Sequence, residues 1–150
     1  MIKLVLKKYL ITEQKCVPLQ QKENGQKNLK ISHKKFIYLI SPDRKLNSEF
    51  IKELIIIFKT GRIGFFQLRL KKNLSEREMI AKKIQKICKK YKVKFIINDD
   101  PYFAKQINAD GCHLGQKDEK IDIAREILKK KIIGITCHNS MKLAKKATLK

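Results

Sequence analysis

From Phe36 onward, short runs rich in β-branched and aromatic residues alternate with longer segments whose apolar residues recur at helical spacing. This alternation predicts a parallel sheet, because neighbouring parallel strands need a long crossover and a helix usually supplies it. The expected strands cover residues 36–41, 65–69, 94–98, 111–114 and 132–136. The expected helices cover residues 48–59, 75–91, 101–107 and 118–130, with a last one from about 140. This order fits either an open doubly wound α/β sheet or part of a (β/α)8 barrel.

Two of the expected helices carry start signals in the sequence. Helix 75–91 has one apolar stripe, and Ser75 and Glu78 at its start have the spacing of a capping box. The next helix is expected to begin with Asp100 as its N-cap and Pro101 as its first residue, where a missing N–H costs nothing. Each apolar stripe must pack against the sheet, which supports the layered α/β arrangement.

Residues 1–35 differ in texture from the rest of the chain. After a first turn or strand they are polar, with many Gln, Lys and Asn residues and little periodicity. We expect a basic tail or linker here, for which disorder is one outcome. A single folded domain is expected over residues 36–150, since 43% of the residues are hydrophobic and occur in spaced clusters.

The chain shows no membrane segment or disulfide framework. Its apolar runs are far shorter than the roughly 20 residues that span a bilayer, and Met1 to Leu10 lack the pattern of a secretory signal. The four cysteines form no C-x-x-C pair. We therefore expect a cytoplasmic protein with reduced thiols.

The net charge of +22 raises the question of nucleic-acid binding. The cations are mostly lysines spread over every expected helix, and aromatic residues interleaved with arginine are missing, so no stacking platform for single strands is visible. The distribution favours a compositional bias, and nucleic acid is not expected as the main partner.

Polar residues cluster at the carboxyl ends of successive expected strands, where parallel α/β folds place their active sites. Strand alternation puts Gln67, Arg69 and Lys71 on one face. An amide and two cations on one face suit a phosphate or diphosphate, although a solvated strand end would look the same.

The next strand ends provide oxygen ligands. Asp99 is free to face the mouth of the sheet if Asp100 caps a helix, and a carboxylate of this kind suits Mg²⁺. Asp118 supplies a second carboxylate, unless it is only the N-cap of the following helix. The hydroxyl of Thr136 can donate to a phosphate. Two Cys-His pairs, at 112–113 and 137–138, do not predict zinc, because neighbouring strand residues point to opposite faces.

These motifs stand in the order of a known family. They are Gln-Leu-Arg-x-Lys at 67–71, Ile-Asn-Asp at 97–99, Ala-Asp-Gly-x-His-Leu-Gly-Gln-x-Asp at 109–118 and Ile-Gly-x-Thr-x-His at 133–138. Together they resemble thiamine phosphate synthase, in a superfamily that also holds TenI-like proteins. The stretch Tyr-Leu-Ile-Ser-Pro-Asp at 38–43 resembles that family's first strand and turn. The resemblance covers about residues 36–150.

The resemblance implies a (β/α)8 barrel, of which this sequence would form about five parallel strands with flanking helices in a partial TIM barrel that is not closed. It implies condensation of hydroxymethylpyrimidine diphosphate with thiazole phosphate to thiamine phosphate and pyrophosphate. The residues it assigns to the pyrimidine diphosphate are Gln67, Arg69, Lys71, Asn98 and Thr136, with Arg69 and Lys71 as the catalytic cations. Thr136 replaces the family's usual serine. The resemblance further implies that Asp99 and Asp118 bind Mg²⁺.

Three readings remain open at this point. The family's later lysine-containing loop and glycine-rich loop do not occur in the sequence, so we expect weak turnover at most from a synthase. A noncatalytic TenI-like protein that keeps the diphosphate pocket is the second reading, and a basic nucleic-acid-binding module is the third. Five strands in an open sheet also leave two free edges, through which the chain could associate with itself or with a partner chain.

Overall fold

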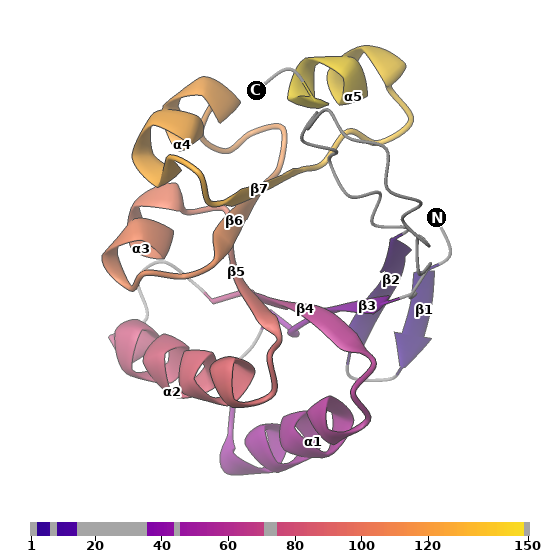
Figure 1. The fold of residues 1–150 in the computed structure, drawn as a ribbon, viewed down its shortest axis with the longest axis vertical. Helices are drawn as coiled ribbons and strands as arrows, with labels where there is room; N and C mark the ends of the chain where they lie inside the picture. Colours follow the sequence, from indigo (N-terminus) through magenta and orange to yellow (C-terminus); the bar gives the residue numbers. More distant parts are fainter. Residues whose placement is uncertain (1–2, 7–8, 15–35, 44–45, 71–74, 149–150) are drawn as a thin grey trace, which may run out of the picture.

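The computed structural model describes residues 3–6, 9–14, 36–43, 46–70 and 75–148 (Figure 1). Its strands form a single sheet in sequence order. The strands are β1 (Lys3–Leu6), β2 (Tyr9–Gln14), β3 (Phe36–Ile40), β4 (Ile63–Leu68), β5 (Lys94–Asn98), β6 (Gly111–Leu114) and β7 (Ile132–Ile135). The helices are α1 (Ser48–Lys59), α2 (Arg77–Lys90), α3 (Pro101–Gln106), α4 (Ile121–Leu128) and α5 (Met141–Thr148).

The five strands β3 to β7 pair in parallel, each with its neighbour in sequence. The sheet curves, and α1 to α4 lie along its outer side (Figure 1). This arrangement confirms the predicted partial (β/α)8 barrel with about five parallel strands and flanking helices. Among the described strands β7 pairs only with β6, so the barrel is open at that edge.

The core lies between the outer face of the sheet and the helices. Phe66 and Phe95 are fully buried there, and the ring of Phe58 in α1 packs edge-on against Phe66 at 5.8 Å between centroids. Burial of each such side chain stabilises the fold by about 2–3 kcal/mol. Alternation along the strands therefore sends the next residues, such as Gln67, to the opposite face. We call that face, away from the helices, the inner face.

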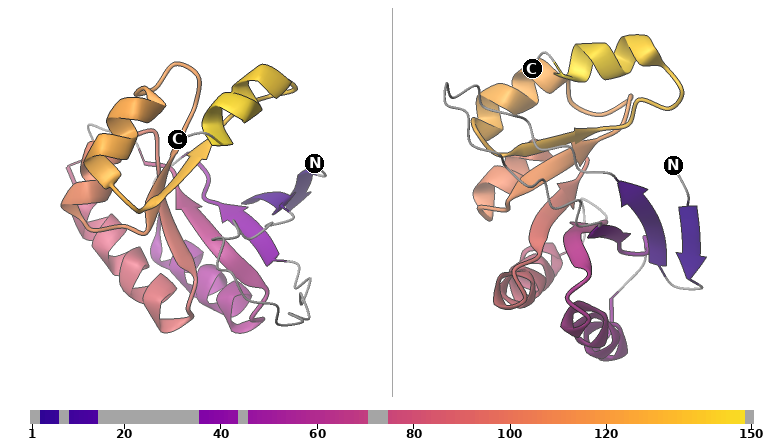
Figure 2. Two further views of the ribbon diagram at one scale, coloured as in Figure 1. Left: turned by 45° about the horizontal axis from the view of Figure 1, so that its top comes forward. Right: turned by 45° about the vertical axis from the view of Figure 1, so that its right-hand side comes forward.

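The amino-terminal segment contains a feature that the expected tail did not include. β1 and β2 form an antiparallel hairpin, and β2 runs antiparallel beside β3 (Figure 2). In this pairing Thr12 lies opposite Tyr38. Residues 15–35, which hold most of the expected linker, lie outside the described residues. The edge of β3, expected to be free, is therefore covered by β2, while the expected free edge at β7 has no partner among the described strands.

The helix starts agree with the sequence in one case and differ in two. Asp100 caps α3 as predicted, since its Oδ1 accepts from the N–H of Phe103 at 2.9 Å. The predicted capping box of α2 is wrong, because Glu76 is the N-cap and makes no side-chain capping bond. Asp118 is not the N-cap of α4, which begins after Lys120.

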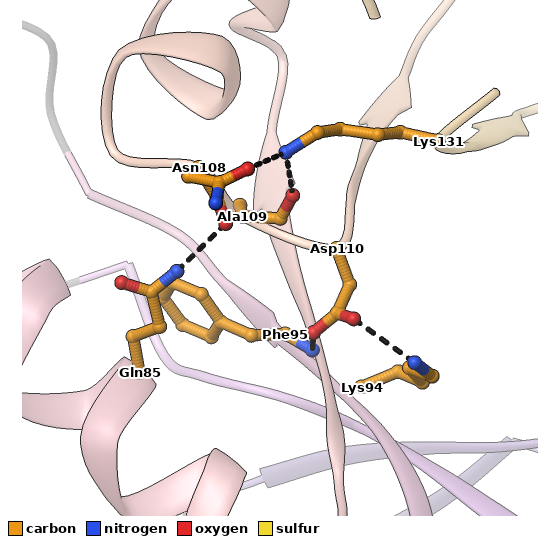
Figure 3. A network of polar contacts seen from close by, with 7 residues as sticks. All are labelled: Gln85, Lys94, Phe95, Asn108, Ala109, Asp110 and Lys131. Carbon is orange, nitrogen blue, oxygen red and sulfur yellow. Dashed lines mark hydrogen bonds and ion pairs between the residues drawn. The ribbon is translucent and has the colours of Figure 1, made fainter. Parts of the chain in front are cut away.

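Polar contacts join the loops at the amino ends of the strands (Figure 3). The Asp110 carboxylate accepts from the backbone N–H of Phe95 at 2.9 Å and from Lys94 Nζ at 3.0 Å. Lys131 Nζ donates to the carbonyl of Ala109 at 2.7 Å and to the side chain of Asn108. A further bond runs from Gln85 Nε2 to the Asn108 carbonyl at 2.9 Å. We call these residues the amino rim.

None of the helices in the described parts of the chain is both long and apolar enough to cross a membrane.

Candidate functional site

Polar side chains of β4 to β7 gather at the carboxyl ends of the strands, on the inner face. Gln67 is the next-to-last residue of β4, Asn98 ends β5, and His113 lies opposite Asn98 in the register of β6. Thr136 follows β7 directly. We call these residues, together with Tyr38, Ser41, Arg69, Asp99 and Asp118, the carboxyl rim. Among the predicted site residues, hydrogen bonds join Gln67, Asn98 and Asp99, and the convergence of Arg69 and Asp118 on them stays a prediction.

A row of hydrogen bonds crosses three strands of this rim. Tyr38 Oη donates to Gln67 Oε1 at 3.1 Å, and Gln67 Nε2 donates to Asn98 Oδ1. Asn98 Nδ2 then donates to Asp99 Oδ2. The Gln67 side chain is only 4% exposed, so its amide needs these partners. We call these four residues the amide chain.

The backbone of Asp99 is held in an unusual conformation. Its φ of +61° lies in the left-handed region, which Asp tolerates better than most residues. The Asp99 N–H donates to the carbonyl of His113 at 2.7 Å, which joins this turn to β6. Strained residues of this kind cluster at functional sites. The turn carries the carboxylate beyond the end of β5 and bonds its Oδ2 to Asn98.

The neighbouring Asp100 has a structural task. Besides capping α3, it pairs with Arg77 Nη2 at 2.9 Å. Both side chains are mostly buried, with 15% of Asp100 and 13% of Arg77 exposed. The guanidinium also lies 3.7 Å from the centroid of the Phe103 ring. Asp100 thus ties α2 to α3.

His113 and Thr136 form a pair between β6 and the end of β7. His113 Nε2 lies 2.9 Å from Thr136 Oγ1. The ring lies against Gly134, where a Cβ atom would stand 2.6 Å from Nδ1. Burial lowers the pKa of His113, and the negative charge of Asp118 opposes this shift. The Thr136 hydroxyl therefore has a protein partner that the sequence did not predict.

Asp118 lies in the turn after β6. Its Oδ2 accepts from the N–H of Gly115 at 2.6 Å, so the carboxylate closes this turn instead of capping α4. Burial raises the pKa of the Cys112 thiol to about 12; a backbone hydrogen bond to Asp100 opposes this, and the charges of Asp100, Asp99 and Asp118 add to it.

Arg69 is positioned through its backbone. The hydroxyl of Ser41, which is buried at the end of β3, accepts from the Arg69 N–H at 2.8 Å. The guanidinium of Arg69 forms no ion pair with any residue that the structure describes. Lys71, the second predicted cation, lies outside the described residues.

The donor set of the rim fits a magnesium ion, although no group of three or more His, Cys, Asp or Glu side chains is gathered within the described ranges. Mg²⁺ commonly takes only one or two carboxylates and completes its shell with waters and substrate phosphate oxygens. Asp99 and Asp118 supply two hard carboxylates from adjacent strand ends.

Three rim residues lay outside the predicted site. Tyr38 and Ser41 were noted only as part of a motif, and His113 was not assigned a role. The signal for Tyr38 and His113 was strand alternation, which places Tyr38 on the same face as its stacking partner Phe65, at 5.5 Å between centroids. The same alternation separates Cys112, buried in the core, from His113 on the inner face.

Comparisons with known proteins point to one family. A family model described as thiamine monophosphate synthase matches residues 37–150. The thiamine-phosphate synthase of Pelagibacter ubique is 59% identical over 116 residues, which are 77% of this chain and 56% of the relative. That of Fusobacterium nucleatum is 41% identical over 116 residues, or 75% of this chain and 55% of the relative. The chain thus spans little more than half the length of these relatives.

A solved structure is also similar. The thiamine phosphate pyrophosphorylase from Pyrococcus furiosus superposes with a TM-score of 0.56 and 29% sequence identity. The match covers 65% of this chain and 48% of the other.

Proposed function

Because the chain belongs to the thiamine monophosphate synthase family, we propose that its carboxyl rim binds hydroxymethylpyrimidine diphosphate. The proposed reaction is condensation with thiazole phosphate to thiamine phosphate and pyrophosphate, a transferase reaction. The observation that carries this proposal is the gathering of an arginine, two amides, two carboxylates and a hydroxyl at the same ends of adjacent parallel strands.

The diphosphate is proposed to lie between Arg69 and the carboxylates. Arg69 can hold two phosphate oxygens at once, and Lys71 would add a second positive charge. Asp99 and Asp118 would hold Mg²⁺, and a bound ion would supply positive charge to offset that of the diphosphate. The two carboxylates and the diphosphate are all negatively charged, so binding should depend on the metal.

The pyrimidine is proposed to be oriented by the remaining polar groups. Gln67 and Asn98 offer amide groups, and the Thr136 hydroxyl is held by His113. In the proposed reaction the carbon–oxygen bond to the diphosphate breaks and its electron pair leaves with the diphosphate. The thiazole nitrogen then donates its lone pair to that carbon and forms the new carbon–nitrogen bond. Arg69 and Lys71 stabilise the charge that develops on the leaving oxygens, and no general base is required.

Calorimetry with hydroxymethylpyrimidine diphosphate, with and without Mg²⁺, tests the proposal. Wild-type chain should bind in the presence of Mg²⁺ and much more weakly without it. Asp99→Ala should lose the Mg²⁺-dependent part, because one of two proposed protein ligands is removed. Glu126→Ala, which removes an exposed carboxylate on the outer helix α4, is the control and should bind as wild type does.

Equal binding by wild type and by Asp99→Ala, each with and without Mg²⁺, would contradict the metal assignment. If the chain instead binds nucleic acids as well as it binds the diphosphate, without Mg²⁺ and with an affinity that falls steeply with salt, a basic nucleic-acid-binding module is supported. The proposed location is the cytoplasm. The proposed partners are the two small-molecule substrates, with association through the β7 edge as a further possibility to be measured by sedimentation.

A further inference from the structure

The four residues of the amide chain have a fixed direction. An ionised carboxylate can only accept hydrogen bonds, so Asn98 must present its Nδ2 to Asp99. Its Oδ1 then faces Gln67, which must present Nε2 in return. The Oε1 of Gln67 is left facing Tyr38, and the phenol satisfies it as a donor. Each bond in the row is therefore determined by the next.

Tyr38 is built to be this donor. Its ring stacks on Phe65 at 5.5 Å and an angle of 16°, which places the hydroxyl over the end of β4. Burial raises the pKa of Tyr38 well above its ordinary value, with a smaller contribution from Cys112, so the hydroxyl keeps its proton at neutral pH. The row thus begins at a group that can always donate and ends at one that can only accept.

We propose that Tyr38 is a positioning residue: by donating to Gln67, its hydroxyl orients both amides and so fixes the carboxylate of Asp99 in the direction seen here. The proposal rests on the proposed function only in giving Asp99 the task of binding Mg²⁺. Tyr38 touches neither the metal site nor the diphosphate in this assignment and acts through Gln67 and Asn98.

The physical reason is the burial of the Gln67 amide. With 4% of Gln67 exposed, water cannot replace a missing donor at Oε1. Without the phenol, Oε1 of Gln67 is left buried without its donor, so only the bond to Asn98 still favours the present orientation and the amide turns over more readily. A turned Gln67 would point its oxygen at Asn98 Oδ1, which in turn would rotate and bring an oxygen against the Asp99 carboxylate.

The test uses Tyr38→Phe in the full 150-residue chain, which keeps the ring and its stacking on Phe65. Tyr102→Phe is the matched control, because that side chain is 60% exposed on α3. The first readout is NMR without any ligand, following the side-chain amide signals of Gln67 and Asn98 and the carboxyl carbon of Asp99. All three should shift in Tyr38→Phe and none in Tyr102→Phe.

The second readout is Mg²⁺ affinity, measured by titration in the presence of inorganic pyrophosphate. Groups that orient metal ligands typically contribute tenfold or more to affinity, so Tyr38→Phe should bind Mg²⁺ about tenfold more weakly. Gln67→Glu is a second variant, because a carboxylate there accepts from both neighbours and forces Asn98 to present its oxygen to Asp99. It should weaken Mg²⁺ binding more than Tyr38→Phe does.

The outcomes separate the two ideas. If wild type does not bind Mg²⁺ with pyrophosphate, the proposed function fails, while the ligand-free NMR still decides whether Tyr38 orients the row. A shift confined to Gln67, or unchanged Mg²⁺ affinity in a wild-type-like fold, overturns the positioning role. If a variant does not fold, NMR of the wild-type protein still tests the bond on which the proposal depends. The Tyr38 hydroxyl proton must then be visible and close to the Gln67 side chain, and its absence overturns the proposal.

Discussion

The two ends of the parallel sheet use polar side chains in different ways. At the amino rim, Asp110, Lys131 and Gln85 each bond at least one backbone group of a neighbouring loop or strand (Figure 3). At the carboxyl rim, Ser41 and Asp118 also bond backbone groups, but the amide chain and the pair His113–Thr136 join side chains directly to one another. The first pattern completes backbone hydrogen bonding and holds the fold together. The second holds functional groups in fixed positions relative to one another, which is what a binding site requires.

The contrast is sharpest at two adjacent residues. Asp100 pairs with Arg77 of α2 and accepts from a backbone N–H at the start of α3. It therefore bonds a backbone group of a neighbouring element, as the amino-rim residues do. Asp99 bonds through its side chain to Asn98 and belongs to the amide chain. Position at one end of the sheet therefore does not by itself define a role; the kind of partner does.

Arg77→Met tests this division with the largest expected effect on stability. Removing one member of a mostly buried ion pair leaves Asp100 partly uncompensated, and we expect the free energy of unfolding to fall by about 3 kcal/mol. Urea denaturation measures the change. Lys82→Met on the same helix removes the exposed pair with Glu78 and should cost no more than about 0.5 kcal/mol. Equal losses in the two variants would mean that the Arg77 pair is not structural.

Asp110→Ala tests the structural role of the amino rim. The N–H of the buried Phe95 would lose its partner, which should cost about 2 kcal/mol in the free energy of unfolding. Lys94→Met removes only the exposed ion pair to Asp110 and is the control, with about 0.5 kcal/mol or less expected. Neither variant should change Mg²⁺-dependent binding of the pyrimidine diphosphate, and a loss of binding in a folded Asp110→Ala protein would break the separation of the two rims.

Gly134→Ala perturbs the carboxyl rim from the backbone of β7. The added Cβ would lie 2.6 Å from His113 Nδ1, so the ring must move away from Thr136. We expect a loss of about 1 kcal/mol in unfolding free energy, since the contact is with a side chain that can shift. The ring signals of His113 in NMR spectra should move as well. Unchanged His113 signals would show that the ring does not depend on this close approach.

The smallest effect is expected from the pH dependence of stability without added Mg²⁺. Burial lowers the pKa of His113 in the folded protein from 6.5, so the unfolded chain binds this proton more readily. Stability that depends on the neutral ring is therefore fully present above about pH 6.5 and is lost as the pH falls from there to the lowered pKa. Denaturation midpoints of wild type and His113→Gln between pH 7.5 and roughly pH 5 measure it. A loss of the same size in both proteins would assign the effect to other groups.

Local sequence patterns by themselves determined the order of strands and helices from Phe36 onward and the end of the sheet at which site residues gather. These features follow from the spacing of apolar residues and from strand alternation, which are properties of short segments. The N-cap role of Asp100 was predictable for the same reason, since a capping residue and its helix are neighbours in sequence.

The tertiary structure alone decided which side chains meet across strands. Tyr38 and Gln67 are 29 residues apart, and their bond depends on the register of β3 and β4 and on the curvature of the sheet. The hairpin on β3 and the bond of Asp118 to Gly115 also had no distinct local pattern, because a polar strand resembles a linker and an aspartate before a helix resembles an N-cap. Hydrogen-bond partners compete within a few kilocalories per mole, and only the packed fold brings the final partner within reach.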